Sequence, residues 1–273
     1  MPVCLATMPQ LGWILTWVEV DIHLGNILVP LPQSIDNLSP DQFYAKYGSP
    51  HYEPIKHFDN QPLPAGVPSH GIVPAWLGKA SELIALPEAR ILLTDFGESF
   101  LPSTTERRYS NTPVLSAPPE VRFLPQTPLS FPTDIWSLGC TIWSIIGAKP
   151  LFEGFAPTSD WITMEHVTVL GKLPPEWWEK WDARSKWFNE DGTRNHEGLG
   201  KPWTERFEKF VQEPRQCDGM EVVGGEEKAA LFDMLRSMLA FKPEDRISAD
   251  DALECKWMKE WGLPETEKMK NMQ

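Results

Sequence analysis

The chain has 273 residues with 41% hydrophobic side chains, which suits one large folded domain or two small ones. Its formal net charge of −13 argues against nucleic acid as a direct partner, because phosphate recognition needs clustered Lys and Arg, and its four cysteines lie too far apart in the sequence for a metal knuckle or redox pair. No apolar run is long enough to span a bilayer, so we expect no membrane partner and a location in the cytoplasm, the nucleus or both.

Residues 20–29 read as a short loop leading into an apolar strand, and they come after an N-terminal stub, residues 1–19, that fits neither a helix nor a strand period. Asp21 and Asn26 stand at the two ends of the loop. Alone, an Asp and an Asn at this spacing are weak evidence, since about one such pair is expected by chance and both residues favour turns. Their meaning depends on the motifs further along the chain.

A Pro-rich stretch, residues 30–88, comes next, and we expect a surface insertion that is at best partly ordered. A brief apolar strand over residues 90–94 then ends at Asp95. If Asp95 lies opposite Asp21 and Asn26, the three side chains suit phosphoryl transfer: one Asp orients the attacking hydroxyl, while the Asn and the second Asp hold magnesium on nucleotide phosphates.

The second half of the chain predicts helices. Residues 133–147 have a capping residue at the start, a glycine at the end and apolar side chains on nearly every face, so this helix belongs in the middle of a domain. Further helices are predicted over residues 159–171, 226–239 and 248–257, and the polar tail, residues 263–273, is expected to fray. Strands first and helices after predict an α+β, mainly helical fold in which a short β element carries the site.

Several motifs, taken in order, resemble the large C-terminal lobe of the eukaryotic protein kinases: Asp21-x4-Asn26, Asp95-Phe96-Gly97, Pro118-Pro119-Glu120, residues 134–139 and Asp245-Arg246. Each motif is weak or moderate, but the ordered set covers nearly all of residues 20–260. The resemblance implies a protein-kinase C-lobe over residues 20–262, with the Pro-rich insertion inside it. Residues 1–19 contain no Gly-rich phosphate loop, so we expect a truncated kinase whose small N-lobe is absent.

The resemblance implies ATP and Mg²⁺ as cofactors and assigns roles around them. Asp21 would be the catalytic-loop Asp, and Asn26 and Asp95 would be the metal ligands. His23 stands where the family has a Lys that contacts the transferred phosphate; a neutral imidazole still donates one hydrogen bond but supplies less charge.

The resemblance also implies roles away from the nucleotide. The activation segment would include Phe96, Gly97, Pro119 and Glu120. Glu120 would form a buried ion pair with Arg246, and Asp134 would accept backbone N–H groups of the catalytic loop. Each of these residues also has a plain structural interpretation, since an Asp at the start of a helix is a common N-cap.

The long spacer between Asn26 and Asp95, together with residues 169–174, resembles the SR-protein kinase-like branch. Membership would imply serine/threonine phosphorylation of basic, Arg/Ser-rich proteins, which agrees with the acidic balance of the chain. Two alternatives stay open: a catalytically dead pseudokinase remnant that acts as a binding module, and a small-molecule kinase of the aminoglycoside or choline type. Because the small lobe is expected to be absent, we expect little activity from the chain alone.

Overall fold

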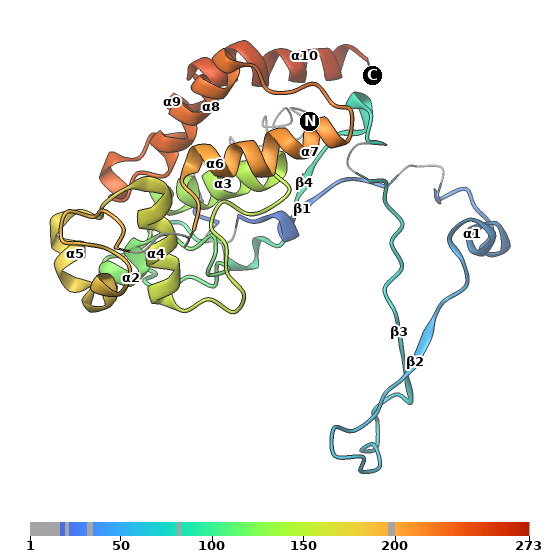
Figure 1. The fold of residues 1–273 in the computed structure, drawn as a ribbon. Helices are drawn as coiled ribbons and strands as arrows, with labels where there is room; N and C mark the ends of the chain where they lie inside the picture. Colours follow the sequence, from blue (N-terminus) through green and yellow to red (C-terminus); the bar gives the residue numbers. More distant parts are fainter. Residues whose placement is uncertain (1–16, 20–21, 32–34, 81–82, 196–199, 273) are drawn as a thin grey trace. The chain divides into compact units, whose positions relative to one another are not determined.

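The structure, a computed structural model, describes residues 17–19, 22–31, 35–80, 83–195 and 200–272. Two compact units can be distinguished: a small one over residues 30–84, and a large one formed by residues 1–29 and 85–273 (Figure 1). Among the described residues, no helix combines the length and the apolar character needed to cross a membrane.

The small unit contains regular structure that the sequence analysis did not predict. Helix α1 (Pro40–Tyr47) begins with a capping box in which Ser39 accepts a hydrogen bond from the backbone N–H of Gln42. Pro40 stands in the first turn, where its missing N–H removes no helical hydrogen bond. Strands β2 (Tyr52–Pro54) and β3 (His70–Ile72) then pair as an antiparallel ribbon. The Pro-rich stretch therefore contains one helix and one two-stranded ribbon, because its prolines stand in the first turn of α1, at the end of β2 and in the connecting loops.

The β element of the large unit is small. Strand β1 (Ile27–Leu28) pairs antiparallel with β4 (Leu92–Leu93), with Ile27 opposite Leu93. Both strands are shorter than the predicted ones, because the ladder ends where the chain enters the turns η2 (Leu24–Asn26) and η6 (Phe96–Glu98). The remainder of the large unit is mostly helical, as predicted.

Helix α3 (Phe131–Ile146) lies at the centre of the large unit, and its residues 133–143 are all buried (Figure 1). It packs on α8 (Gly225–Met238) through a close approach at Gly139. A Cβ added to Gly139 would lie 3.1 Å from Leu239 Cδ2 and 3.2 Å from Met238 Cβ. Only a glycine lets the two helices approach this closely without displacing those side chains.

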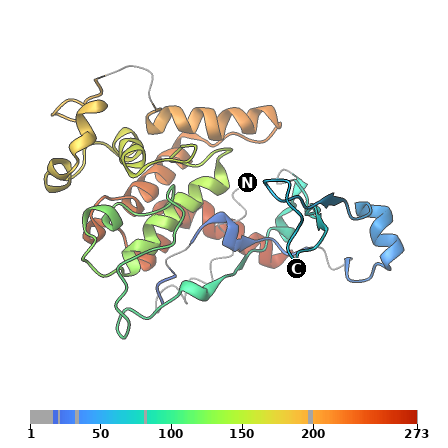
Figure 2. The ribbon, with the colours of Figure 1, turned by 90° about the horizontal axis from the view of Figure 1, so that it is seen from below.

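Short helices surround this pair, and the same arrangement is seen from below in Figure 2. They are α2 (Glu120–Phe123), α4 (Ser159–Leu170), α5 (Pro175–Lys180), α6 (Trp203–Phe207), α7 (Glu213–Cys217) and α9 (Ala249–Leu253). The 3-10 turns η5 (Leu86–Glu88), η7 (Asp182–Lys186) and η9 (Pro243–Asp245) lie among them. Two π-helical segments, η8 (Glu208–Gln212) and η10 (Met258–Gly262), lead directly into α7 and α10. The tryptophans at the start of the segment 177–203 are core residues. They belong to a second hydrophobic cluster of Phe123, Met164, Val167, Leu173, Trp177, Trp178, Trp181 and Phe188.

The C-terminal tail, which was expected to fray, is helical. Residues Leu263–Asn271 form helix α10, which continues directly from η10. Thr266 and Met269 are buried, and the turn η5 lies against the helix. The sequence looked polar because only one side chain per turn of this helix faces the protein.

Candidate active site

Asn26 and Asp95, the two proposed metal ligands, are brought to neighbouring positions by the β element. The backbone N–H of Thr94 donates to the Asn26 carbonyl at 2.9 Å, and Thr94 Oγ1 donates to the same oxygen at 3.2 Å. Thr94 immediately precedes Asp95, so the ladder places the turn with Asn26 beside the turn with Asp95. Residues 68 positions apart in the sequence thus share one edge of the large unit.

The segment that leads into the loop is anchored to α3. The backbone N–H of Glu19 donates to Asp134 Oδ2 at 2.8 Å, and the Asp134 side chain is fully buried. On the other side of the loop, Thr141 Oγ1 donates to the Ile22 carbonyl at 3.0 Å. Helix α3 therefore holds the chain on both sides of residues 20–21, and the turn η2, drawn in blue, lies beside α3 in Figures 1 and 2.

Asp21 itself lies outside the described residues. Its described neighbourhood is also tied to the segment after Asp95: Val18 and Phe100 exchange two backbone hydrogen bonds of 2.9 Å each. Ser99 Oγ in addition donates to Glu19 Oε2 at 2.6 Å. The chain that precedes Asp21 and the chain that comes after Asp95 are therefore paired.

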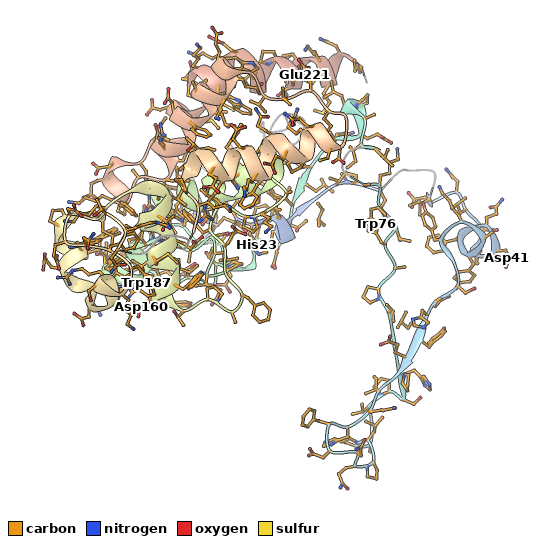
Figure 3. The ribbon with its side chains drawn as sticks, viewed as in Figure 1. His23, Asp41, Trp76, Asp160, Trp187 and Glu221 are labelled. Atoms are coloured by element: carbon orange, nitrogen blue, oxygen red, sulfur yellow. The ribbon has the colours of Figure 1, made fainter. Side chains whose placement is uncertain are left out.

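His23 opens the turn η2 and is oriented by its own loop (Figure 3). Its backbone is extended, with φ −148° and ψ 167°, and its Nδ1 accepts a hydrogen bond of 3.0 Å from the backbone N–H of Gly25. The His23 carbonyl accepts a second bond, also 3.0 Å, from the N–H of Asn26. The ring and the carbonyl together cap the turn that carries Asn26.

Asp95 adopts a left-handed backbone, with φ 64° and ψ 51°, a region that Asp tolerates better than most residues. Its side chain is exposed, and so is the ring of Phe96. A carboxylate and a carboxamide are oxygen ligands that suit Mg²⁺, which commonly binds through one or two carboxylates and keeps waters and phosphate oxygens as its other ligands. Within the described ranges, no group of three or more His, Cys, Asp and Glu side chains lies close enough to hold a metal ion.

The segment after Gly97 is tied down at several points. Arg107 Nη1 donates to the carbonyl and to the carboxylate of Glu98, at 2.6 and 2.8 Å. Pro119 is the N-cap of α2, and Glu120 is the first residue of that helix. Arg246 reaches Glu120 with two hydrogen bonds, of 2.7 and 2.5 Å, and both side chains are buried.

The structure contains a second buried ion pair that the sequence analysis missed. Arg206 Nη2 donates to Glu165 Oε1 at 3.0 Å, and the Arg206 side chain is fully buried. Its other donors reach the carbonyls of Lys201 and Leu151, both at 2.6 Å. Nothing in the sequence around either residue distinguishes it from a surface helix position, and the two partners lie 41 residues apart.

A surface cluster around Asp160 was missed as well. Arg122, two residues after Glu120, donates to Asp160 Oδ1 at 2.5 Å, and Trp181 Nε1 donates to the same oxygen at 3.0 Å. Trp181 also stacks on Trp187, with 5.7 Å between ring centroids, and Asp160 and Trp187 are labelled in Figure 3. The hydrogen bond from Arg122 lowers the pKa of Asp160 below its ordinary value. Helix α2 is thus joined to α4 and to the tryptophan cluster.

Burial shifts the pKa of two core groups. Desolvation lowers the pKa of His166 to about 3, with the positive charges of Arg246 and Arg122 acting in the same direction. His166 is therefore neutral at physiological pH and packs edge-on against Trp136 and Phe152. Burial likewise raises the pKa of the Cys140 thiol, so this cysteine is an unreactive core residue.

Comparison with known proteins identifies the architecture. The family model "Protein kinase domain" matches residues 79–258, which include Asp95, Glu120, Asp134 and Arg246 but not the loop with Asp21 and Asn26. The matched region is about two thirds of the chain.

Curated relatives of the chain are also named as protein kinases. A serine/threonine protein kinase of Aspergillus fumigatus is 27% identical over 178 residues, 61% of this chain and 40% of that protein. The dual specificity protein kinase lkh1 of Schizosaccharomyces pombe is 23% identical over 252 residues, 87% of this chain and 34% of that protein. The mitogen-activated protein kinase spm1 of the same yeast is 29% identical over 150 residues, 52% of this chain and 30% of that protein. The chain spans less than half the length of these relatives, and it belongs to the protein kinase family.

Proposed function

We propose that this chain carries the catalytic-loop and metal-binding part of a serine/threonine protein kinase that transfers the γ-phosphate of ATP to a protein hydroxyl. Asp21 orients the attacking hydroxyl, and Asn26 and Asp95 supply oxygen ligands for Mg²⁺. Bound Mg²⁺ would neutralise charge that develops on the phosphates. His23 takes the place of the Lys that contacts the transferred phosphoryl group.

One observation carries this proposal: the double hydrogen bond from Thr94 to the Asn26 carbonyl. These two hydrogen bonds join the turn that contains Asn26 to Thr94, the residue before Asp95. The side chains of Asn26 and Asp95 take no part in these two bonds. Two oxygen-bearing side chains from distant parts of the sequence are therefore supported by backbone geometry. Enzymes catalyse phosphoryl transfer mainly by positioning the reacting groups in this way and by electrostatic stabilisation.

The acceptor we propose is a basic, Arg/Ser-rich protein of the kind phosphorylated by the SR-protein kinase-like branch. Two features support this choice. The net charge of −13 favours association with a basic substrate. The long spacer between Asn26 and Asp95 contains a compact unit of its own, residues 30–84, rather than a short hairpin.

Nucleotide binding tests the metal site directly. We expect Mg·ATP to raise the melting temperature of the chain, and Asn26→Ala and Asp95→Asn each to weaken the apparent affinity at least tenfold, because each removes a ligand oxygen or its charge. Asp59→Asn, in the Pro-rich unit, is the matched control and should bind normally. If the two site variants bind as well as the wild type, Asn26 and Asp95 are not the metal ligands.

A second candidate is a pseudokinase that serves as a protein-binding module. It is favoured by His23 at the Lys position and by the start of the family match at residue 79, beyond the loop of Asp21 and Asn26. Transfer of ³²P from ATP separates the candidates when an Arg/Ser-rich peptide, a Ser peptide without Arg, kanamycin and choline are offered in parallel. Labelling of the Arg/Ser-rich peptide supports the first proposal; nucleotide binding with no labelled acceptor supports the second; labelling of kanamycin or choline would support a small-molecule kinase.

A further inference from the structure

We infer that His23 and Gly25 form a matched pair in which Gly25 acts as a positioning residue for the imidazole. The backbone N–H of Gly25 holds His23 Nδ1 as an acceptor, and the absence of a Cβ at residue 25 lets the ring lie over the turn. The catalytic consequence rests on the proposed function, whereas the pairing itself rests on geometry alone.

The hydrogen bond fixes the chemical form of the ring. A neutral imidazole has one N–H, and a ring whose Nδ1 accepts a hydrogen bond must carry its proton on Nε2. The Gly25 N–H lies 3.0 Å from Nδ1. The loop therefore presents His23 as the Nε2–H tautomer, with one N–H donor at the position where related kinases have an ammonium group.

The requirement for glycine is steric and specific to His23. A Cβ built on Gly25 would lie 2.6 Å from His23 Cε1 and 2.9 Å from His23 Nδ1, both too short for a real contact. The third near atom, at 3.8 Å, is also from the His23 ring, and it is Nε2. Any side chain at residue 25 would therefore push the imidazole away from its N–H partner. With the imidazole removed, the same Cβ would meet none of these atoms.

The Pro-rich unit offers an internal comparison. His57 Nδ1 accepts a hydrogen bond from the backbone N–H of Asp59, again two residues later, but at 3.3 Å. Residue 59 carries a side chain, so the longer bond is compatible with a Cβ where the shorter one at residue 25 is not. His57 Nδ1 also lies 4.0 Å from Asp59 Oδ2, so His57 serves as a reference in which a carboxylate faces the same ring nitrogen.

Histidine NMR tests the tautomer without requiring activity. In the full chain labelled with ¹⁵N-histidine at pH 8, long-range ¹H–¹⁵N correlation should show His23 with a protonated Nε2 and a non-protonated Nδ1. His23→Gln assigns the resonance by its disappearance, and His57 is expected to show a less complete preference. A His23 ring protonated on Nδ1, or one that exchanges freely between both tautomers, would overturn the inference.

A double-mutant cycle tests the glycine. Gly25→Ala should lower the urea midpoint and shift the His23 resonances toward a tautomer mixture, whereas Gly25→Ala in a His23→Ala background should leave the midpoint unchanged. Equal loss in both backgrounds would show that Gly25 serves the backbone and not the ring. If Gly25→Ala does not fold, the wild-type spectrum and the comparison of His23→Ala with the double variant still decide the point.

Activity completes the test and separates it from the proposed function. If the chain phosphorylates an Arg/Ser-rich peptide, Gly25→Ala and His23→Ala should reduce the rate by the same factor, and the double variant by no more than that factor. Independent, multiplying losses would contradict the pairing. A wild type that neither binds Mg·ATP nor transfers phosphate would refute the proposed function, while the NMR result and the stability cycle would still stand or fall on their own.

Discussion

Arg246 donates hydrogen bonds to both carboxylate oxygens of Glu120 across 126 residues of sequence, at 2.7 and 2.5 Å. Its remaining N–H groups are also engaged. Nε donates to the Ala240 carbonyl, Nη1 to the Pro132 carbonyl and Nη2 to the Phe241 carbonyl. One guanidinium group therefore joins α2, the start of α3 and the segment after α8, and its charge is paired with the buried carboxylate of Glu120.

Removal of one partner from this pair should be strongly destabilising. We expect Glu120→Gln and Arg246→Met each to lower the free energy of unfolding by about 3 to 5 kcal/mol, because each leaves a buried charge uncompensated. The double variant Glu120→Gln/Arg246→Met should lose less than the sum of the single losses. Urea denaturation monitored by tryptophan fluorescence measures all three.

The exposed pair of Lys259 and Glu254 provides the control for that series. Its nitrogen and oxygen lie 2.7 Å apart, but the side chains are 54% and 71% exposed. Glu254→Gln should therefore change stability by no more than about 1 kcal/mol. Additive losses at residues 120 and 246, or losses as small as that of the control, would mean that the buried pair contributes little.

Asp134 should stabilise residues 17–29 more strongly than Thr141, which lies further along the same helix. Asp134→Ala removes the buried acceptor of the Glu19 N–H, so we expect a loss of about 1 to 3 kcal/mol and faster proteolysis within residues 17–29. Thr141→Val, on the same helix, removes only the hydroxyl bond to the Ile22 carbonyl and should lose about 0.5 to 1.5 kcal/mol. Limited proteolysis with mass mapping measures the loop effect; equal cleavage of the two variants would argue against a special role for Asp134.

Elements that are marked by a short local motif, such as an N-cap residue, could be predicted from the sequence. Within the predicted helix 248–257, Ser248 caps α9: its Oγ accepts a hydrogen bond from the Asp251 N–H at 3.1 Å, as the Ser-x-x-Asp pattern of residues 248–251 predicts. Thr158 similarly caps α4, whose observed start at Ser159 agrees with the predicted one. The ordered motifs were also sufficient to suggest the kinase family, because each motif is local.

Features that depend on distant partners could not be predicted. The pair of Glu165 and Arg206 joins α4 to α6 across 41 residues of sequence, and the sequence of neither helix names the partner of its charged residue. Helix α3 begins two residues before the predicted Thr133, because the first turn accepts Pro132 and needs no side-chain cap. The tautomer of His23 likewise depends on the backbone of the turn, which the residue types alone do not specify.

Gly139 offers a test of the packing between α3 and α8. Gly139→Ala gains about 1 kcal/mol of helix propensity but places a methyl group 3.1 to 3.2 Å from Leu239 and Met238, and overpacking of this kind costs about 1 to 3 kcal/mol. We expect net destabilisation. Gly225→Ala, at the first residue of α8, meets no atom within 4 Å and should be neutral or stabilising. Thermal melts measure the melting temperatures of the two variants. A Gly139→Ala protein as stable as the wild type would mean that Leu239 and Met238 can move to make room for the methyl group.

Buried His166 should make stability depend on pH between neutrality and acid. Its pKa is lowered from 6.5 to about 3 in the folded protein, so below pH 6.5 the unfolded chain binds a proton that the native state does not. Stability from this group is complete above pH 6.5 and falls as pH decreases, by up to about 1.4 kcal/mol per pH unit. Between pH 7 and pH 5 we expect a loss of about 2 kcal/mol that is missing in His166→Gln.

The depressed pKa of Asp160 also favours the native state at neutral pH, but its contribution is lost only as the pH falls toward and below 3.8, so Asp160 does not produce the slope above pH 5. Burial raises the pKa of Glu227 above its ordinary value, so this group stabilises the native state as the pH falls and opposes the histidine effect; the comparison with His166→Gln separates the two. His51→Gln, in the Pro-rich unit, is the control and should retain the wild-type slope. Urea titrations at half-unit pH steps measure the slopes. A wild type whose stability is flat between pH 7 and pH 5, or a His166→Gln variant with an unchanged slope, would show that the protein accommodates the protonated imidazole. The charges of Arg246 and Arg122 make that accommodation unfavourable, because a protonated His166 would be a buried cation close to two other positive charges.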